Sequence, residues 1–172
     1  PLRYEDAPAY PNFPGEHDDS FYGEGLFIGY RSYEKRGIPV CFPFGHGLSY
    51  TTFTQKPLTG ALRFDIPRDE TLTVPVEVTN TGSRPGSQVI QLYAAERQPE
   101  LLRPVQELRA FAKVTLQPGE TRTVELTLRR ADLACYDPRR GAWVTPVGAY
   151  VLRLGTSSAD IFAELDLTVA GP

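Results

Sequence analysis

TLTVPVEVT, residues 71–79, alternates apolar and polar side chains from one end to the other. Leu72 and the three valines that follow it fall on one face, while threonine and glutamate side chains fall on the other. A period of two is that of a β-strand with one buried face. Pro75 stands on the polar face and lacks a backbone N–H, which predicts an edge strand or a bulge at this position.

The same alternation recurs along the chain, so the sequence predicts seven strands. The other six are residues 61–66, 88–95, 105–116, 121–129, 147–155 and 161–169. Turn signals rich in glycine, proline and small polar residues stand at residues 80–87, 117–120 and 137–141. Half-buried strands joined by short polar turns predict an all-β fold, a two-sheet antiparallel sandwich of the immunoglobulin-like or fibronectin type III-like kind. The chain lacks the Cys–Trp–Cys arrangement of a true immunoglobulin domain.

The composition is typical of a soluble globular protein and argues against several functions. The 172 residues suffice for one domain with an appendage. A net charge of −3, with scattered Lys and Arg, gives no attraction to a phosphate backbone, so we expect no nucleic acid partner. No apolar run approaches the roughly 18 residues of a membrane span. Two cysteines without clustered histidines predict neither a disulfide framework nor a zinc site, and we expect no cofactor and no metal.

Residues 1–55 differ from the rest of the chain and predict an extended N-terminal arm. Four prolines among the first 14 residues oppose a regular helix or a central strand. Acidic side chains outnumber basic ones at the start of this arm. The first residues lack the charged-then-apolar build of a signal peptide, and both a cytoplasmic and a secreted location stay open.

No motif predicts a nucleotide site or a catalytic triad. Gly23, Gly25 and Gly29 miss the dinucleotide-binding spacing by one residue, and no clear βαβ unit surrounds them. His46 and Ser49 lack the sequence context of a nucleophilic hydrolase. These glycines and His46 therefore favour structural roles at turns and close backbone approaches.

Carboxylates in the arm are the candidates for glycoside hydrolysis. A pair of carboxylates can hydrolyse a glycoside when a walled cleft holds them about 5 to 9 Å apart. Glu16, Asp18, Asp19 and Glu24 supply the groups, but a proline-rich arm cannot build walls that raise one pKa and hold a sugar. The sequence favours solvated acids, with a buried Glu24 paired to Arg31.

Aromatic side chains crowd residues 22–53 and predict a hydrophobic seam rather than a sugar-stacking platform. Eight Tyr and Phe rings in this range have few polar neighbours. They would form an exposed apolar patch if nothing covered them. Trp143, which follows the turn at residues 137–141, is likewise expected to pack in the core or at a sheet end.

Residues 22–53, YGEGLFIGYRSYEKRGIPVCFPFGHGLSYTTF, resemble the signature that ends the second domain of glycoside hydrolase family 3 enzymes, especially the β-glucosidases. Residues 5–16 are similar to the approach to that signature. Three later segments resemble the fibronectin type III-like domain that closes many such chains: residues 86–93, 103–121 and 141–161. The similarity covers nearly the whole chain, in order.

The resemblance implies two parts. Residues 1–55 would be the terminal segment of an αβα sandwich domain, with its last β-strand and a connector, and residues 56–172 would be the fibronectin type III-like domain. Glycines and aromatic rings would seal the joint between the domains. Six residues would belong to this structural joint: Glu24, Arg31, Phe42, Phe44, His46 and Tyr50.

The family's catalytic residues have no match in this chain. Its nucleophile is an aspartate in an N-terminal barrel, and its acid/base is a glutamate earlier in the sandwich domain. The resemblance therefore implies the non-catalytic C-terminal segment of a retaining, exo-acting β-glucosidase, which would meet a β-glucoside only through the missing catalytic domains. An autonomous carbohydrate-binding module and a protein-interaction module are the alternatives, although neither accounts for the arm. A homodimer also stays open.

Overall fold

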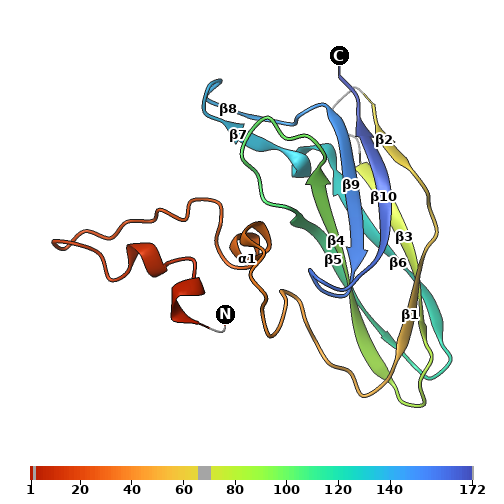
Figure 1. The fold of residues 1–172 in the computed structure, drawn as a ribbon. Helices are drawn as coiled ribbons and strands as arrows, with labels where there is room; N and C mark the ends of the chain where they lie inside the picture. Colours follow the sequence, from red (N-terminus) through yellow and green to blue (C-terminus); the bar gives the residue numbers. More distant parts are fainter. Residues whose placement is uncertain (2, 66–70, 172) are drawn as a thin grey trace.

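The computed structural model describes residues 1, 3–65 and 71–171, and a β-sandwich dominates it (Figure 1). These residues contain ten strands: β1 (Phe53–Pro57), β2 (Leu62–Phe64), β3 (Thr71–Asn80), β4 (Gly86–Glu96), β5 (Glu107–Leu116), β6 (Thr121–Arg129), β7 (Cys135–Asp137), β8 (Ala142–Val144), β9 (Gly148–Gly155) and β10 (Ile161–Val169). A three-stranded sheet in the order β1-β3-β6 faces a five-stranded sheet in the order β2-β10-β9-β4-β5. The strands β7 and β8 form a separate hairpin.

The all-β sandwich predicted from the sequence is confirmed, and the seven predicted segments correspond to β2, β3, β4, β5, β6, β9 and β10. Ile66, the last residue of the first predicted segment, lies outside the described residues. The prediction of seven strands missed β1 and the β7–β8 hairpin. One pair also departs from the antiparallel pattern, because β2 runs parallel to β10.

The alternation in residues 71–79 becomes the buried face of β3. Val74, Val76 and Val78 have no exposed surface. They join one hydrophobic cluster with apolar side chains from β4, β5, β6, β9 and β10. Burial of such surface stabilises the fold by about 25 cal/mol per Å². The period-two pattern therefore places these side chains where the two sheets pack against each other.

Pro75 does not mark an edge strand or a bulge, so that prediction was wrong. The strand β3 is central in its sheet, and its register with β6 is continuous. The Pro75 carbonyl accepts a hydrogen bond from the backbone N–H of Leu58 at 3.0 Å. In an antiparallel strand the N–H and C=O of one residue point to the same neighbour. The missing N–H therefore falls where that neighbour, β1, has just ended at Pro57.

Most of the arm projects from one side of the sandwich (Figure 1). Where described, residues 1–52 contain short helical elements, loops and one isolated antiparallel bridge between Glu16 and Asp19. The elements are η1 (Tyr4–Asp6), η2 (Tyr10–Asn12) and the helix α1 (Tyr30–Arg36), whereas η3 (Arg130–Leu133) precedes the hairpin. The helix α1 stands where the resemblance implied a last β-strand. A strand there would have no neighbour in this chain for its backbone hydrogen bonds, which a helix satisfies internally.

Glycines bound α1 on both sides. Gly29 precedes the helix, and Gly37 ends it in the left-handed conformation with φ 63°. The Gly37 N–H bonds to the carbonyls of the last turn, where Lys35 and Arg36 also lie. Within the described residues, no helix is long and apolar enough to cross a membrane.

Candidate domain joint

The first turn of α1 docks on the sandwich through one tyrosine. The Tyr30 ring stacks on the Phe44 ring, with centroids 4.7 Å apart and an interplanar angle of 17°. The same ring makes a T-shaped contact with Tyr93 of β4 at 6.2 Å. The Tyr30 hydroxyl accepts a hydrogen bond from the backbone N–H of Leu108 at 3.0 Å. One side chain thus ties the helix and the following loop to both β4 and β5.

One turn later, Glu34 meets a buried amide. Gln106, 4% exposed, donates from Nε2 to Glu34 Oε1 at 3.1 Å and to the Ser158 carbonyl at 2.7 Å. The second carboxylate oxygen of Glu34, Oε2, is buried and receives no hydrogen bond. Burial raises the pKa of Glu34 above its ordinary value, against the opposing effects of Ser158, Gln106 and Arg153.

We expect the docking of α1 to weaken as the pH rises. The folded pKa of Glu34 is raised, so its contribution to stability is complete below the ordinary value of 4.5 and is lost as the pH passes the folded value. Glu34→Gln removes the charge and keeps an acceptor for Gln106, so docking should become independent of pH in this range. Hydrogen exchange of the α1 amides, corrected for intrinsic rates, measures this.

Glu16→Gln is the matched control, because Glu16 is an exposed carboxylate in the same arm. It should leave the pH dependence of α1 exchange unchanged. An undiminished pH dependence in Glu34→Gln would contradict the role assigned to Glu34.

Phe44 and Gly45 fix the loop that follows α1. The backbone N–H of Ser158 donates to the Phe44 carbonyl at 2.8 Å. Gln91 donates from Nε2 to the Gly45 carbonyl at 3.3 Å and to the Thr156 carbonyl at 2.7 Å. Gly45 has φ 80°, and an added Cβ would lie 2.4 Å from the Gln91 side chain. Glycine is therefore required here by both the backbone conformation and the close approach.

A buried ionic cluster at the start of β5 receives α1. Arg103 pairs with Glu96 at 3.1 Å and with Glu107 at 2.8 Å, and each of the three side chains is at most 13% exposed. Arg109 pairs with Glu107 at 2.6 Å. Arg31 of α1 pairs with the same carboxylate of Glu107 at 3.5 Å. Burial by itself lowers the pKa of Arg103. The neighbouring carboxylates of Glu107 and Glu96 outweigh this effect, so the pKa of Arg103 lies above its ordinary value. The helix thus completes a cluster that the sandwich has already assembled.

The structure places two of the six predicted joint residues against the sandwich, Arg31 and Phe44. Glu24 does not pair with Arg31, so the predicted ion pair was wrong. Glu24 is half-buried and accepts a hydrogen bond from Asn12 Nδ2 at 3.4 Å. The physical reason is α1, which turns Arg31 toward Glu107 instead.

The other three predicted residues lie on the surface. Phe42 is 73% exposed and Tyr50 is 93% exposed. The Phe42 and His46 rings lie 5.3 Å apart, and His46 is exposed as well. Their role in a joint stays a prediction.

Glu34, Gln106, Glu107 and Ser158 were missed by the sequence analysis. The helix face could have been found, because Tyr30 and Glu34 are four residues apart and Gly37 signals a helix end. Gln106 could not have been found this way. It is 72 residues from Glu34 and 52 from Ser158 along the chain, and only the fold brings them together.

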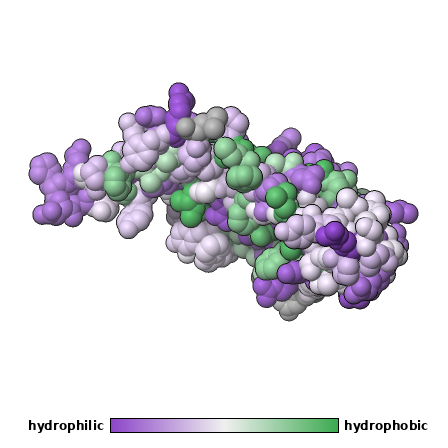
Figure 2. Space-filling model, turned by 90° about the horizontal axis from the view of Figure 1, so that it is seen from below, coloured by the Kyte–Doolittle hydropathy of each residue, from purple (hydrophilic) through white to green (hydrophobic). Residues whose placement is uncertain are grey.

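Apolar side chains of the arm are largely exposed. Nine of them are each more than half exposed: Tyr4, Phe13, Phe21, Tyr22, Leu26, Ile28, Phe42, Leu48 and Tyr50. Figure 2 shows hydrophobic side chains on the surface where the arm meets the sandwich. The seam predicted from the sequence is therefore uncovered over these positions in this chain.

A groove of about 750 Å³ runs beside α1, lined mainly by aromatic and apolar side chains. Its walls include Tyr30, Tyr33, Phe42 and Phe44, with the Glu34 side chain among them. The groove belongs to the same surface as the exposed rings of the arm. In the described part of the chain, no group of three or more His, Cys, Asp or Glu side chains is placed to hold a metal ion.

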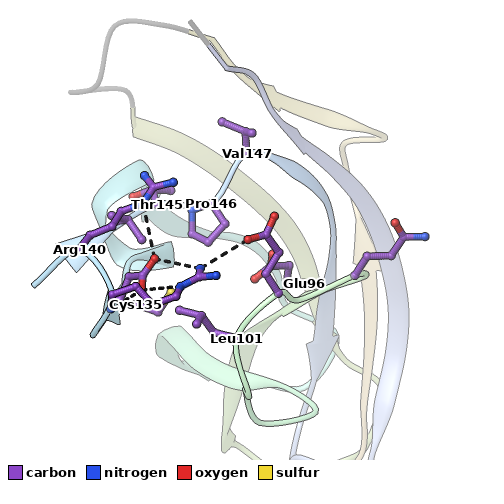
Figure 3. Close-up of a pocket in the computed structure, with 12 residues that line it drawn as sticks. Glu96, Leu101, Cys135, Arg140, Thr145, Pro146 and Val147 are labelled. Atoms are coloured by element: carbon purple, nitrogen blue, oxygen red, sulfur yellow. Dashed lines mark hydrogen bonds and ion pairs between the residues drawn. The ribbon is translucent and has the colours of Figure 1, made fainter. Parts of the chain in front are cut away.

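A second hollow, of about 350 Å³, lies beside the β7–β8 hairpin (Figure 3). Glu96 and Leu101 line it on one side, and Cys135, Arg140 and Thr145 line it on the other. The hairpin therefore packs back toward the loop after β4.

Residues 88–158 match the family model of the fibronectin type III-like domain. This range begins in β4 and ends just after β9, so the match falls on the sandwich.

Curated relatives of this chain are β-glucosidases. A probable β-glucosidase I of Emericella nidulans is 41% identical, over 97% of this chain and 20% of that protein. The thermostable β-glucosidase B of Acetivibrio thermocellus is 40% identical, over 98% of this chain and 22% of that protein. The chain thus spans about a fifth of the length of the curated relatives it matches.

Solved structures match the arm and the sandwich together. A β-glucosidase from Kluyveromyces marxianus gives a TM-score of 0.90 at 39% identity, covering 99% of this chain and 20% of that one. A GH3 β-glucosidase from Bifidobacterium adolescentis gives 0.89 at 34% identity, covering 98% of this chain and 24% of that one. These matches identify the chain with the C-terminal part of the glycoside hydrolase family 3 β-glucosidases, including their fibronectin type III-like domain.

Proposed function

We propose that the chain is the non-catalytic C-terminal segment of a retaining, exo-acting β-glucosidase and that it stabilises the catalytic domains of that enzyme. The nucleophilic aspartate and the acid/base glutamate then belong to the domains upstream, which hydrolyse terminal non-reducing β-D-glucosyl residues. Retaining hydrolysis needs two carboxylates about 5 to 5.5 Å apart in a cleft, and the upstream domains supply both. The present segment contributes a β-sandwich packed around one hydrophobic cluster and an arm with exposed rings.

The exposed rings of the arm carry this proposal. Nine apolar side chains of the arm stand uncovered, an arrangement that proteins in water normally avoid. The matched Kluyveromyces structure has the same fold over 99% of this chain, and this chain covers only 20% of it. The rest of such a polypeptide is a partner large enough to bury the rings.

Within this proposal, residues 1–55 complete the αβα sandwich domain and residues 56–172 form the fibronectin type III-like domain. The strand β1 crosses that boundary, because it begins at Phe53 and pairs with β3. Because β1 belongs to both parts, the placement of the arm is coupled directly to the three-stranded sheet.

The six joint residues divide into two sets. Arg31 and Phe44 hold the arm to the sandwich through the contacts described above. The remaining residues of the set, Glu24, Phe42, His46 and Tyr50, turn toward the catalytic domains.

The double substitution Phe42→Ala and Tyr50→Ala tests the proposal. In the full-length enzyme it should lower the melting temperature, because each ring contributes about 1.5–3 kcal/mol when fully buried. In the isolated chain the free energy of unfolding should change by no more than about 0.5 kcal/mol, because both rings are already exposed. The KM for an aryl β-glucoside should stay unchanged, since neither ring touches the substrate.

Leu58→Ala is the control, because Leu58 is 47% exposed and directly follows β1, which lies on the side of the sandwich away from α1 (Figure 1). Equal effects of the double substitution in the two proteins would contradict the proposal. Cello-oligosaccharide binding by the isolated chain, lost in the double variant, would favour a carbohydrate-binding module. A concentration-dependent dimer lost in that variant would assign the rings to a second copy.

A further inference from the structure

The β7–β8 hairpin presents two aromatic rings to solvent. Tyr136 and Trp143 are directly opposed across the two strands, and their rings form a T-shaped pair with centroids 6.0 Å apart. Trp143 is 73% exposed and Tyr136 is 51% exposed. The expectation that Trp143 packs in the core or at a sheet end was wrong. The hairpin belongs to neither sheet of the sandwich, and the opposite face of its strands turns inward.

The inward face of the hairpin is firmly anchored. Asp137, 2% exposed, accepts hydrogen bonds from the backbone N–H of Arg139 at 2.9 Å and from its guanidinium at 3.0 and 3.1 Å. Arg140 pairs with the same carboxylate at 3.5 Å. The hydrogen bonds from Arg139 hold the pKa of Asp137 below its ordinary value. A rigid turn presents the two rings, so covering them costs little conformational entropy.

The hairpin lies on the same side of the sandwich as α1 (Figure 1). The loop of residues 97–106 links the two, because Glu100 pairs with Arg139 at 3.5 Å and the end of the loop docks α1. Leu102 and Val105 in this loop are 67% and 43% exposed. Exposed apolar side chains therefore continue from the domain joint, over the loop, to the hairpin.

The side chains at the hairpin are those of a protein interface. Trp, Tyr and Arg are enriched where the binding energy of such interfaces concentrates. The turn of the same hairpin carries two exposed arginines, Arg139 at 61% and Arg140 at 71%. A sugar site would need polar groups converging on the rings. Here the Asp137 carboxylate lies on the opposite face of the hairpin and is already paired with both arginines.

We propose that the hairpin is a second docking point for the catalytic part of the same polypeptide, with Trp143 and Tyr136 as its anchors. The inference rests on the proposed function, because it takes the catalytic domains as the occupant. Since this chain corresponds to about a fifth of its relatives, the remainder is large enough to reach both the arm and the hairpin on one side. The occupant presents an apolar surface to the rings.

Trp143 is the only tryptophan among the 172 residues, so it reports on its own surroundings. The isolated chain and the full-length enzyme are both labelled with 5-fluorotryptophan, and the fluorine resonance of Trp143 is assigned by its loss in Trp143→Phe. A soluble gadolinium chelate then relaxes exposed fluorine nuclei. We expect strong relaxation of this resonance in the isolated chain and loss of most of that relaxation in the full-length enzyme.

Equal relaxation in the two proteins would overturn the inference. The proposed function would still stand if the double substitution Phe42→Ala and Tyr50→Ala lowered the melting temperature of the full-length enzyme. The failure of the inference and the failure of the proposed function are therefore distinguishable. A shift of the resonance when cello-oligosaccharide is added to the isolated chain would assign the rings to a sugar and overturn the inference. A shift with rising concentration of the isolated chain would assign them to a second copy, with the same consequence.

Discussion

Replacing Arg103 by alanine is expected to lower the free energy of unfolding by about 3 kcal/mol or more, because breaking a buried ion pair leaves an uncompensated charge. The Arg103 and Glu96 side chains are each 8% exposed, and their pair spans 3.1 Å. Without Arg103, Glu96 loses the ion-pair partner it has among the described residues, while Glu107 keeps Arg109. Urea unfolding of the isolated chain, followed by circular dichroism, measures the change.

Arg122→Ala provides the matched comparison. Arg122 is 56% exposed and pairs with Glu120 on the surface, so its loss should cost less than about 1 kcal/mol. A loss for Arg103→Ala no larger than the loss for Arg122→Ala would contradict the interpretation of the cluster as buried and mutually dependent.

Asn80→Asp is expected to destabilise the chain by about 3 kcal/mol at neutral pH, because the buried carboxylate oxygen that replaces Nδ2 would face two acceptors. Asn80 has no exposed surface. Its Nδ2 donates to the carbonyls of Arg84 at 2.7 Å and Leu116 at 3.1 Å, and its Oδ1 accepts from the Thr51 hydroxyl at 2.8 Å. A carboxylate cannot donate, so both carbonyls would lose their partner and meet a negative charge.

This deficit should shrink as the pH falls. Burial and the two carbonyls raise the folded pKa of the new carboxyl group above its unfolded value, so the variant regains stability below that folded pKa and loses it as the pH rises through it. Urea midpoints across the acid range show the trend. Gln117→Glu, at an exposed position, makes the same amide-to-acid change and should show no such recovery. A deficit for Asn80→Asp that is equal at all pH values would contradict this account.

The main strands could be predicted because their two faces differ in polarity. In β3 the alternation of valines with threonine and glutamate coincides with alternating burial. The strand β1 escaped notice because FTQKP carries one large apolar side chain, Phe53, and ends in a proline. The strands β7 and β8 have three residues each, too few to display a period. The turn signal at residues 137–141 marked the turn between them, but the strands on either side were too short to be predicted.

The candidate joint was predicted less completely. The crowding of rings drew attention to residues 22–53, but prolines nearby drew attention away from the short helix that positions Tyr30 and Arg31. The partner of Arg31 is Glu107, which lies in another element of the fold. Phe42 and Tyr50 stand exposed, and what they contact depends on residues outside this chain. A single sequence indicates that apolar surface is present, but it does not identify the surface that covers it.

The position of β10 determines when this module can fold during synthesis. It lies between β2 and β9, although both are made before it, and β2 has no other neighbour among the described strands. Residues 62–64 therefore gain their partner strand only when residues 161–169 are available for pairing. Until then β9 shows an unpaired edge, which is open to pairing with other chains. A complete five-stranded sheet therefore requires translation through β10. A polypeptide released earlier keeps the open edge, which quality-control proteases and chaperones recognise.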